Sequence, residues 1–211
     1  PDLEYSFKHA LTHEVTYGSL LQERRRTLHA QLVDAIERLY GDRLGEQIER
    51  LAHHALRGEL WEKAVAYLRR AGLRAMSQAA YREAVAQLEQ ALGALRRVPE
   101  TRQTAELTID IHLDIYNALE AVDWARMEEP LHEAEVLART LGDQRRLARI
   151  ATFMANQRLV TGDYDAAVRF GQEVLSIART LGDRSIEVVA TRFLGETYAA
   201  RGEFSDAATF L

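Results

Sequence analysis

The sequence contains no cysteine, only three prolines and only two lysines. Without cysteine, a disulfide framework and a zinc site with thiolate ligands are both excluded. The scarcity of proline removes the residue that most often interrupts helices. No apolar run approaches the roughly 18 residues that would span a bilayer, and no segment has the pattern of a signal peptide. We therefore expect a cytoplasmic protein with no membrane partner.

The chain also lacks a surplus of positive charge, since 32 acidic residues oppose 27 basic ones and the formal net charge is -5. Nucleic-acid binding depends mainly on clustered lysine and arginine, so we expect no nucleic-acid partner.

Neither Lys8 nor Lys63 follows a glycine, and the Gly-x-x-x-x-Gly-Lys phosphate loop does not occur. We therefore expect no cofactor and no enzymatic activity from this chain. Because it begins at Pro1 and ends at Leu211 within an expected helix, we expect a piece of a longer protein.

What the sequence does contain is a repeat with a period of 40 residues. The segment Ala-Arg-Thr-Leu-Gly-Asp occurs at residues 138–143 and again at 178–183. Gly-Asp-Tyr at 162–164 returns as Gly-Glu-Phe at 202–204. Apolar residues between these breaks recur three and four positions apart, which predicts helices of about 16 to 18 residues. Glycine and aspartate at the breaks suit left-handed helix ends and helix N-caps, and the short turns predict antiparallel helix pairs.

Aromatic residues are expected at the start of helices throughout the repeats. Five of them are predicted to be structural wedges between helices: Trp61, Tyr81, Trp124, Tyr164 and Phe204. Pro99 is expected to end the helix that begins at Tyr81, after which residues 100–104 shift the register. Pro130 is expected in the first turn of a helix that starts near Arg126.

Residues 1–45 do not show the repeat. They predict two amphipathic helices, one around residues 7–21 and one over 23–39 that ends at Tyr40-Gly41-Asp42. The expected organisation is therefore a helical connector over residues 1–45 followed by a repeat domain over residues 46–211.

The last repeat resembles a tetratricopeptide repeat (TPR). Its marker residues are Leu194, Gly195, Tyr198, Gly202, Phe204, Ala207 and Leu211. The unit around Gly162 departs from the family pattern, with Ala155 and Arg158 where glycine and tyrosine are expected, and the period exceeds the usual 34 residues. The resemblance implies an all-α fold, a right-handed superhelical array of antiparallel helix pairs that forms a TPR-like α-solenoid after the N-terminal helical connector.

A second resemblance covers the N-terminal third. Residues 7–29, from Phe7-Lys8-His9 to Leu28-His29, are similar to the segment that joins the ATPase module to the helical repeats in STAND-type signalling ATPases, most of all those of class III nucleotide cyclases. Residues 46–58, with Leu51-Ala52-His53-His54, are similar to the first repeat helix of those proteins. The resemblance implies that this piece is a regulatory arm of a parent protein with a cyclase domain and a P-loop ATPase.

Several side chains invite a chemical interpretation, and each also has a structural one. His9 and His13 stand four apart without a zincin motif, and His53 and His54 point to different helix faces, so we expect no metal site. The pairs Asp110 with Asp114 and Glu128 with His132 could serve as acid and base, but solvated charge is the favoured interpretation. Arg24-Arg25-Arg26 could contact phosphate, an acidic partner or the ATPase module, and the exposed side of a helix is favoured.

The TPR resemblance also implies where a partner would bind, because groove-lining positions of that family lie on the first helix of each pair. Carried over, these positions are His112, Tyr116, Arg149, Thr152, Asn156, Arg192 and Glu196. Their mixed polar character suits an extended peptide or a protein surface. We expect a non-catalytic interaction and regulatory scaffold that binds a protein, peptide or effector. The parent's own ATPase and cyclase domains are among the expected partners. A segment that completes an enzyme active site, and the sensor arm of a transcription regulator, are the alternatives.

Overall fold

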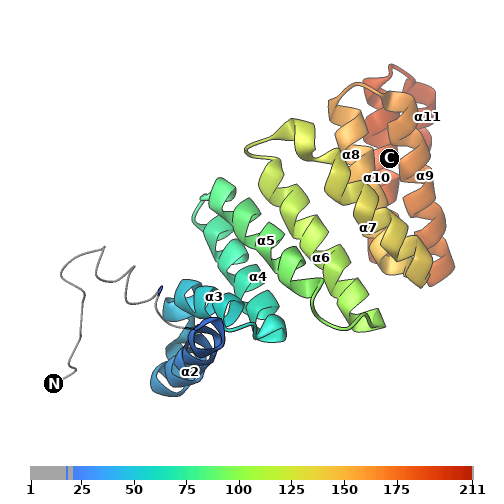
Figure 1. The fold of residues 1–211 in the computed structure, drawn as a ribbon. Helices are drawn as coiled ribbons and strands as arrows, with labels where there is room; N and C mark the ends of the chain where they lie inside the picture. Colours follow the sequence, from blue (N-terminus) through green and yellow to red (C-terminus); the bar gives the residue numbers. More distant parts are fainter. Residues whose placement is uncertain (1–17, 19–20, 211) are drawn as a thin grey trace. The chain divides into compact units, whose positions relative to one another are not determined.

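The structure is a computed structural model that describes residue 18 and residues 21–210 (Figure 1). Every regular element in this part of the chain is a helix. In chain order the elements are α2 Gln22–Tyr40, η1 Gly41–Gln47, α3 Ile48–Arg57, α4 Trp61–Ser77, α5 Tyr81–Leu95, α6 Arg102–Leu119, η2 Trp124–Arg126, α7 Glu128–Leu141, α8 Gln144–Val160, α9 Tyr164–Leu181, α10 Arg184–Ala200 and α11 Phe204–Phe210. The chain divides into two compact units between Pro99 and Glu100, within the segment where the sequence repeat changes register.

In the first unit, α2 packs on α3, α3 on α4, and α4 on α5. The last two helices bury the same pattern of small and large residues, which are Ala64, Leu68, Ala71 and Ala75 in α4 and Ala84, Leu88, Ala91 and Leu95 in α5. Gly72 permits the close approach of these helices, because a Cβ atom there would lie 2.8 Å from Leu88 Cγ. The apolar stripe of each helix is therefore covered by the next helix along the chain.

In the second unit, α6 to α11 pack on one another in succession. Gly171 of α9 repeats the role of Gly72, since a Cβ atom there would lie 2.8 Å from Leu194 Cδ2 in α10. Helix starts are capped by aspartate: Asp143 accepts a hydrogen bond from the Arg146 N–H, and Asp163 accepts one from the Ala166 N–H. These caps satisfy backbone donors that a helix start leaves open.

The turns between paired helices place one residue in the left-handed region. In the second unit this residue is glycine, with φ of 80° at Gly162 and 83° at Gly202. In the first unit Glu59 and Ala79 occupy the equivalent turns with φ of 56° and 59°. A side chain with a Cβ atom is strained there by about 1–2 kcal/mol, so the first unit has less favourable turns than the second.

The predicted all-α fold and the predicted helix breaks are confirmed. The helix at residues 23–39 is α2, and Pro130 lies in the first turn of α7. The expected helix over residues 7–21 lies outside the described residues, apart from residues 18 and 21. The wedge prediction is wrong for two aromatics, because Phe204 is 72% exposed and Trp124 is 49% exposed. Trp124 also opens a short 3-10 turn, and α7 itself begins at Glu128.

Candidate functional site

The seven predicted groove residues fall on α6, α8 and α10, the first helices of successive pairs. Four of them have exposed side chains, namely Arg149, Asn156, Arg192 and Glu196. Thr152 is half-buried, and its hydroxyl donates a hydrogen bond to the Ala148 carbonyl oxygen at 2.8 Å. His112 and Tyr116 are only 6% and 3% exposed, so a partner cannot contact these two residues.

His112 joins α6 to α7 through an interaction that the sequence pattern did not indicate. Its Nε2 atom lies 3.0 Å from Oε2 of Glu133. The histidine side chain is 8% exposed, whereas that of Glu133 is 49% exposed. His112 is therefore held as a packing residue between two helices, which explains why it does not face the predicted groove.

Tyr116 instead packs beneath the predicted surface, against Phe153 of α8. Its ring centroid lies 4.9 Å from that of Phe153 on α8, and the guanidinium carbon of Arg149 lies 5.7 Å from the Phe153 centroid. Burial, and then the charge of Glu120, raises the pKa of the Tyr116 hydroxyl to about 12. Phe153 is a functional candidate that the sequence reasoning missed, although its place four residues after Arg149 puts both on one helix face.

An ion-pair network fixes α8 relative to α6 beside this surface. Arg146 donates Nε–H to Asp110 Oδ1 and Nη2–H to Asp110 Oδ2, both at 3.0 Å, and Nη1–H to Asp143 Oδ2 at 2.7 Å. Hydrogen bonds to Asp110 and Asp143 raise the pKa of Arg146 above its usual range. Burial alone would raise the pKa of Asp143, but the hydrogen bonds from Arg146 lower it. Asp110 is thus paired with Arg146, and Asp114 is buried at 8% exposed, so the interpretation of these two carboxylates as solvated charge is wrong for Asp114.

The exposed face of α10 carries both charge and apolar surface. Arg192 pairs with Glu196 at 2.8 Å, and both side chains remain largely exposed. Val188 and Val189 on the same helix are 62% and 45% exposed. Arg192 also borders a hollow of about 650 Å³ with Arg179, Gly182, Arg184, Glu187, Val188, Thr191 and Phe210. This face can therefore form guanidinium contacts and apolar contacts at the same time.

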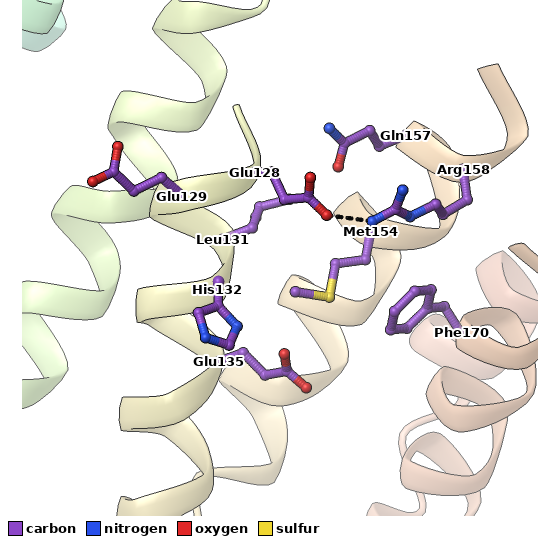
Figure 2. A pocket seen from close by; sticks show the side chains of 9 residues that line it. All are labelled: Glu128, Glu129, Leu131, His132, Glu135, Met154, Gln157, Arg158 and Phe170. Carbon is purple, nitrogen blue, oxygen red and sulfur yellow. Dashed lines mark hydrogen bonds and ion pairs between the residues drawn. The ribbon is translucent and has the colours of Figure 1, made fainter. Parts of the chain in front are cut away.

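A second hollow lies between α7, α8 and α9 (Figure 2). Its volume is about 430 Å³, and it is lined by Glu128, Glu129, Leu131, His132, Glu135, Met154, Gln157, Arg158 and Phe170. The sequence had placed Glu128 and His132 on one helix face, and the structure has both at this groove. Arg158 stands nine positions after Arg149, about half a turn away around the helix. The groove is therefore on the side of α8 opposite the predicted surface.

In the first unit, the basic run Arg24-Arg25-Arg26 at the start of α2 forms an ion pair through its last residue. Arg26 pairs with Glu59 of the turn before α4 at 3.2 Å, and Arg24 is exposed. Next to this run, His29 Nδ1 and His54 Nδ1 lie 2.8 Å apart, and His53 is exposed. Burial, together with neighbouring positive charge, lowers the pKa of His29 and lowers that of His54 to about 4.

Among the described residues, no group of three or more side chains is gathered in a way that could hold a metal ion. His9 and His13 lie outside the described residues. Within the described part of the chain, no helix is both long enough and apolar enough to cross a bilayer.

The class of fold is defined by comparison with solved structures. The chain resembles BtubC (BKLC) of P. vanneervenii, with a TM-score of 0.61 and 18% identity over 92% of this chain and 89% of that one. It resembles a protein of Podosopora anserina with nearly identical TPR-like repeats, with a TM-score of 0.63 and 16% identity over 90% and 92% of the two chains. The fold is a TPR-like α-solenoid.

A third solved structure with this fold is a STAND protein with a tetratricopeptide repeat sensor from Pyrococcus horikoshii. Its TM-score is 0.59 at 14% identity, over 96% of this chain and 36% of that one. Among curated proteins, an uncharacterised protein of Rhizobium meliloti (strain 1021) is 35% identical over 102 residues, which are 48% of this chain and 10% of that protein. The matched part of the chain thus spans about a tenth of that relative. No protein-family model matches the chain.

Proposed function

We propose that this chain is a non-catalytic interaction and regulatory module that binds an extended peptide or a protein surface on α8 and α10. The binding residues are Arg149, Thr152, Asn156, Arg192 and Glu196. TPR-like repeats generally mediate protein interactions, and the fold fits a scaffold role. The observation that carries the proposal is the ring contact of Arg149, because its exposed guanidinium lies over Phe153, which in turn packs against the buried Tyr116.

Pre-organisation of this kind favours binding, since a side chain that is already ordered loses less conformational entropy when a partner arrives. Arg192 and Glu196 on α10 add a second pair of polar contacts, and Val188 and Val189 supply apolar area. An extended segment that crosses α8 and α10 could use all of these side chains.

The parent protein is proposed to be a cytoplasmic STAND-type signalling ATPase, with an attached nucleotide cyclase and this chain as its sensor arm. The resemblance of residues 7–29 and the STAND sensor among the solved structures support this assignment. Binding on the sensor arm would then shift the parent enzyme between two states by differential affinity.

A capture experiment tests the proposal. The chain is immobilised, partners are captured from the parent organism, and a captured protein is purified and its affinity is measured. Arg149→Ala combined with Arg192→Ala is expected to weaken binding at least tenfold. Arg82→Ala combined with Arg169→Ala removes the same charge from exposed sites on α5 and α9 and is expected to bind normally. Equal loss in both double variants, or nucleotide hydrolysis by the chain itself, would contradict the proposal.

A further inference from the structure

The groove between α7, α8 and α9 is a separate feature of the second unit. Its floor is apolar, with Leu131 buried and Met154 and Phe170 half-buried. Figure 2 shows the Met154 side chain extending toward α7, with Glu128 above it and Glu135 below. Since the groove lies on the opposite side of α8 from Arg149, what it binds does not depend on the function proposed above.

The charges around the groove are unbalanced. Arg158 pairs with Glu128 at 2.5 Å. Arg139 pairs with Glu135 at 2.7 Å and with Glu173 at 2.8 Å, so one guanidinium serves two carboxylates. The carboxylate of Glu129 forms no ion pair or hydrogen bond with another residue that the structure describes. The groove and its margin therefore carry two negative charges in excess.

The polar groups at the rim leave room for further hydrogen bonds. Within the described residues, the ring of His132 and the side-chain amide of Gln157 have no partner. Both can donate and accept hydrogen bonds, as a peptide backbone requires. An apolar floor, a negative margin and open rim groups together complement a basic side chain carried on a peptide.

We propose that this groove binds a lysine or arginine side chain of a partner peptide in which an apolar residue stands beside the basic one. The methylene stem of such a side chain would pack on the half-buried Met154, as long basic side chains do on apolar surfaces. The cationic head would be attracted by the carboxylates of Glu128 and Glu135 and by the ring of Phe170. The thioether of Met154 is flexible and polarizable, which suits a variable occupant.

Methyl NMR provides a local test, because the chain has only three methionines, Met76, Met127 and Met154. The ε-methyl groups are ¹³C-labelled and assigned by single Met→Leu variants. Acetyl-Leu-Lys-Leu-Lys-amide is expected to shift the Met154 signal in a saturable manner and to leave that of Met76, in the other unit, unchanged. The matched acetyl-Leu-Glu-Leu-Glu-amide is expected to shift neither. Absence of saturation, or an equal response to both peptides, overturns the proposal.

Two variants of the ion pair at the rim move the affinity in opposite directions. Arg158→Gln leaves Glu128 unpaired and is expected to tighten binding of the lysine peptide about two- to fivefold, in line with the strength of exposed ion pairs. Glu128→Gln leaves Arg158 unpaired and is expected to weaken binding by a similar factor. Loss of folded structure cannot imitate the gain in Arg158→Gln, so failure to observe that gain overturns the proposal.

The control removes one carboxylate of the same unit outside the groove. Asp206 is exposed on α11, and its side chain forms no ion pair with another described residue. Asp206→Asn is therefore expected to leave the affinity for the lysine peptide unchanged. A loss in this control equal to that in Glu128→Gln would show that net charge alone, and not the groove, attracts the peptide.

Discussion

The rings of Tyr116 and Phe153 lie 4.9 Å apart between their centroids and are tilted by 37°, and this contact links a buried residue of α6 to an exposed arginine of α8. Tyr116 cannot touch a partner itself, because it is 3% exposed. It orders Phe153, which in turn lies beside the guanidinium of Arg149. The predicted binding surface therefore has a buried support.

The first prediction concerns Phe153→Leu. This substitution removes the ring that contacts Arg149 and is expected to weaken partner binding about three- to tenfold, since stacked aromatic and cation–π contacts are each worth about 0.5–1.5 kcal/mol. The measurement is calorimetric titration of a captured partner. In an Arg149→Ala background the same change should have little further effect, and additive losses would show that Phe153 does not act through Arg149.

The ion-pair network at Arg146 predicts a loss of stability. Arg146→Met leaves the partly buried Asp110 and Asp143 without their partner and is expected to destabilise the second unit by about 1–3 kcal/mol. The chain has two tryptophans, and Trp124 lies in this unit, so its fluorescence in a Trp61→Phe background reports urea unfolding.

Its neighbour Arg145 supplies the matched control. The Arg145 side chain is 74% exposed and reaches Asp183 only at 3.9 Å. Arg145→Met is therefore expected to change the stability by less than about 0.5 kcal/mol. Equal losses at the two arginines would mean that the network contributes nothing beyond general charge.

The left-handed turns predict a stabilising substitution. Ala79 has a φ of 59° and is exposed, so Ala79→Gly relieves backbone strain without removing packing. After the entropy that glycine adds to the unfolded chain, a gain of about 0.5–1 kcal/mol is expected in the first unit. Trp61 fluorescence in a Trp124→Phe background measures it. The reverse change, Gly162→Ala with a φ of 80°, should destabilise the second unit, and a gain there would contradict the argument.

The glycine turns of the second unit were the part of the fold most readily predicted from sequence. Gly162 and Asp163 act through their own conformational and hydrogen-bonding preferences, which local sequence reveals. The equivalent turn at Ala79 carries no glycine, so its left-handed backbone had no sequence signal. Trp124 was misjudged for a related reason, because burial depends on the neighbouring helices and not on the regular spacing of aromatics.

The site was predicted less completely, since it depends on which helix faces meet. Of the groove positions that the TPR resemblance implied, Arg149 and Arg192 are exposed, but His112 is buried against Glu133 of α7. Spacing also brought Glu128 and His132 together, whereas Met154 and Phe170 reach the same hollow from two other helices. No local sequence pattern predicts that residues of three different helices line the same hollow.

The paired histidines of the first unit predict a dependence of stability on pH. His29 and His54 share a close Nδ1 contact, and both have a lowered pKa, about 4 for His54 against 6.5 in the unfolded chain. The unfolded chain then binds more protons than the folded one between these values. The contribution of the two neutral histidines to the free energy of unfolding is therefore fully present above pH 6.5. It decreases as the pH falls toward 4, by on the order of 2 kcal/mol.

Urea unfolding followed by Trp61 at several pH values checks this dependence. His54→Gln is expected to flatten the decline, because glutamine does not titrate. His132→Gln, which removes an exposed histidine of the second unit, should leave the decline intact. An unchanged decline in His54→Gln would assign the pH dependence to other groups.

The most direct test of the interaction surface is amide hydrogen exchange of the chain with and without a purified partner. The account predicts that slowed exchange concentrates in α8 and α10, around Arg149 and Arg192, and that Arg149→Ala with Arg192→Ala abolishes it. Slowed exchange confined to the first unit, or to α7 and α9 with α8 and α10 unchanged, would contradict the account.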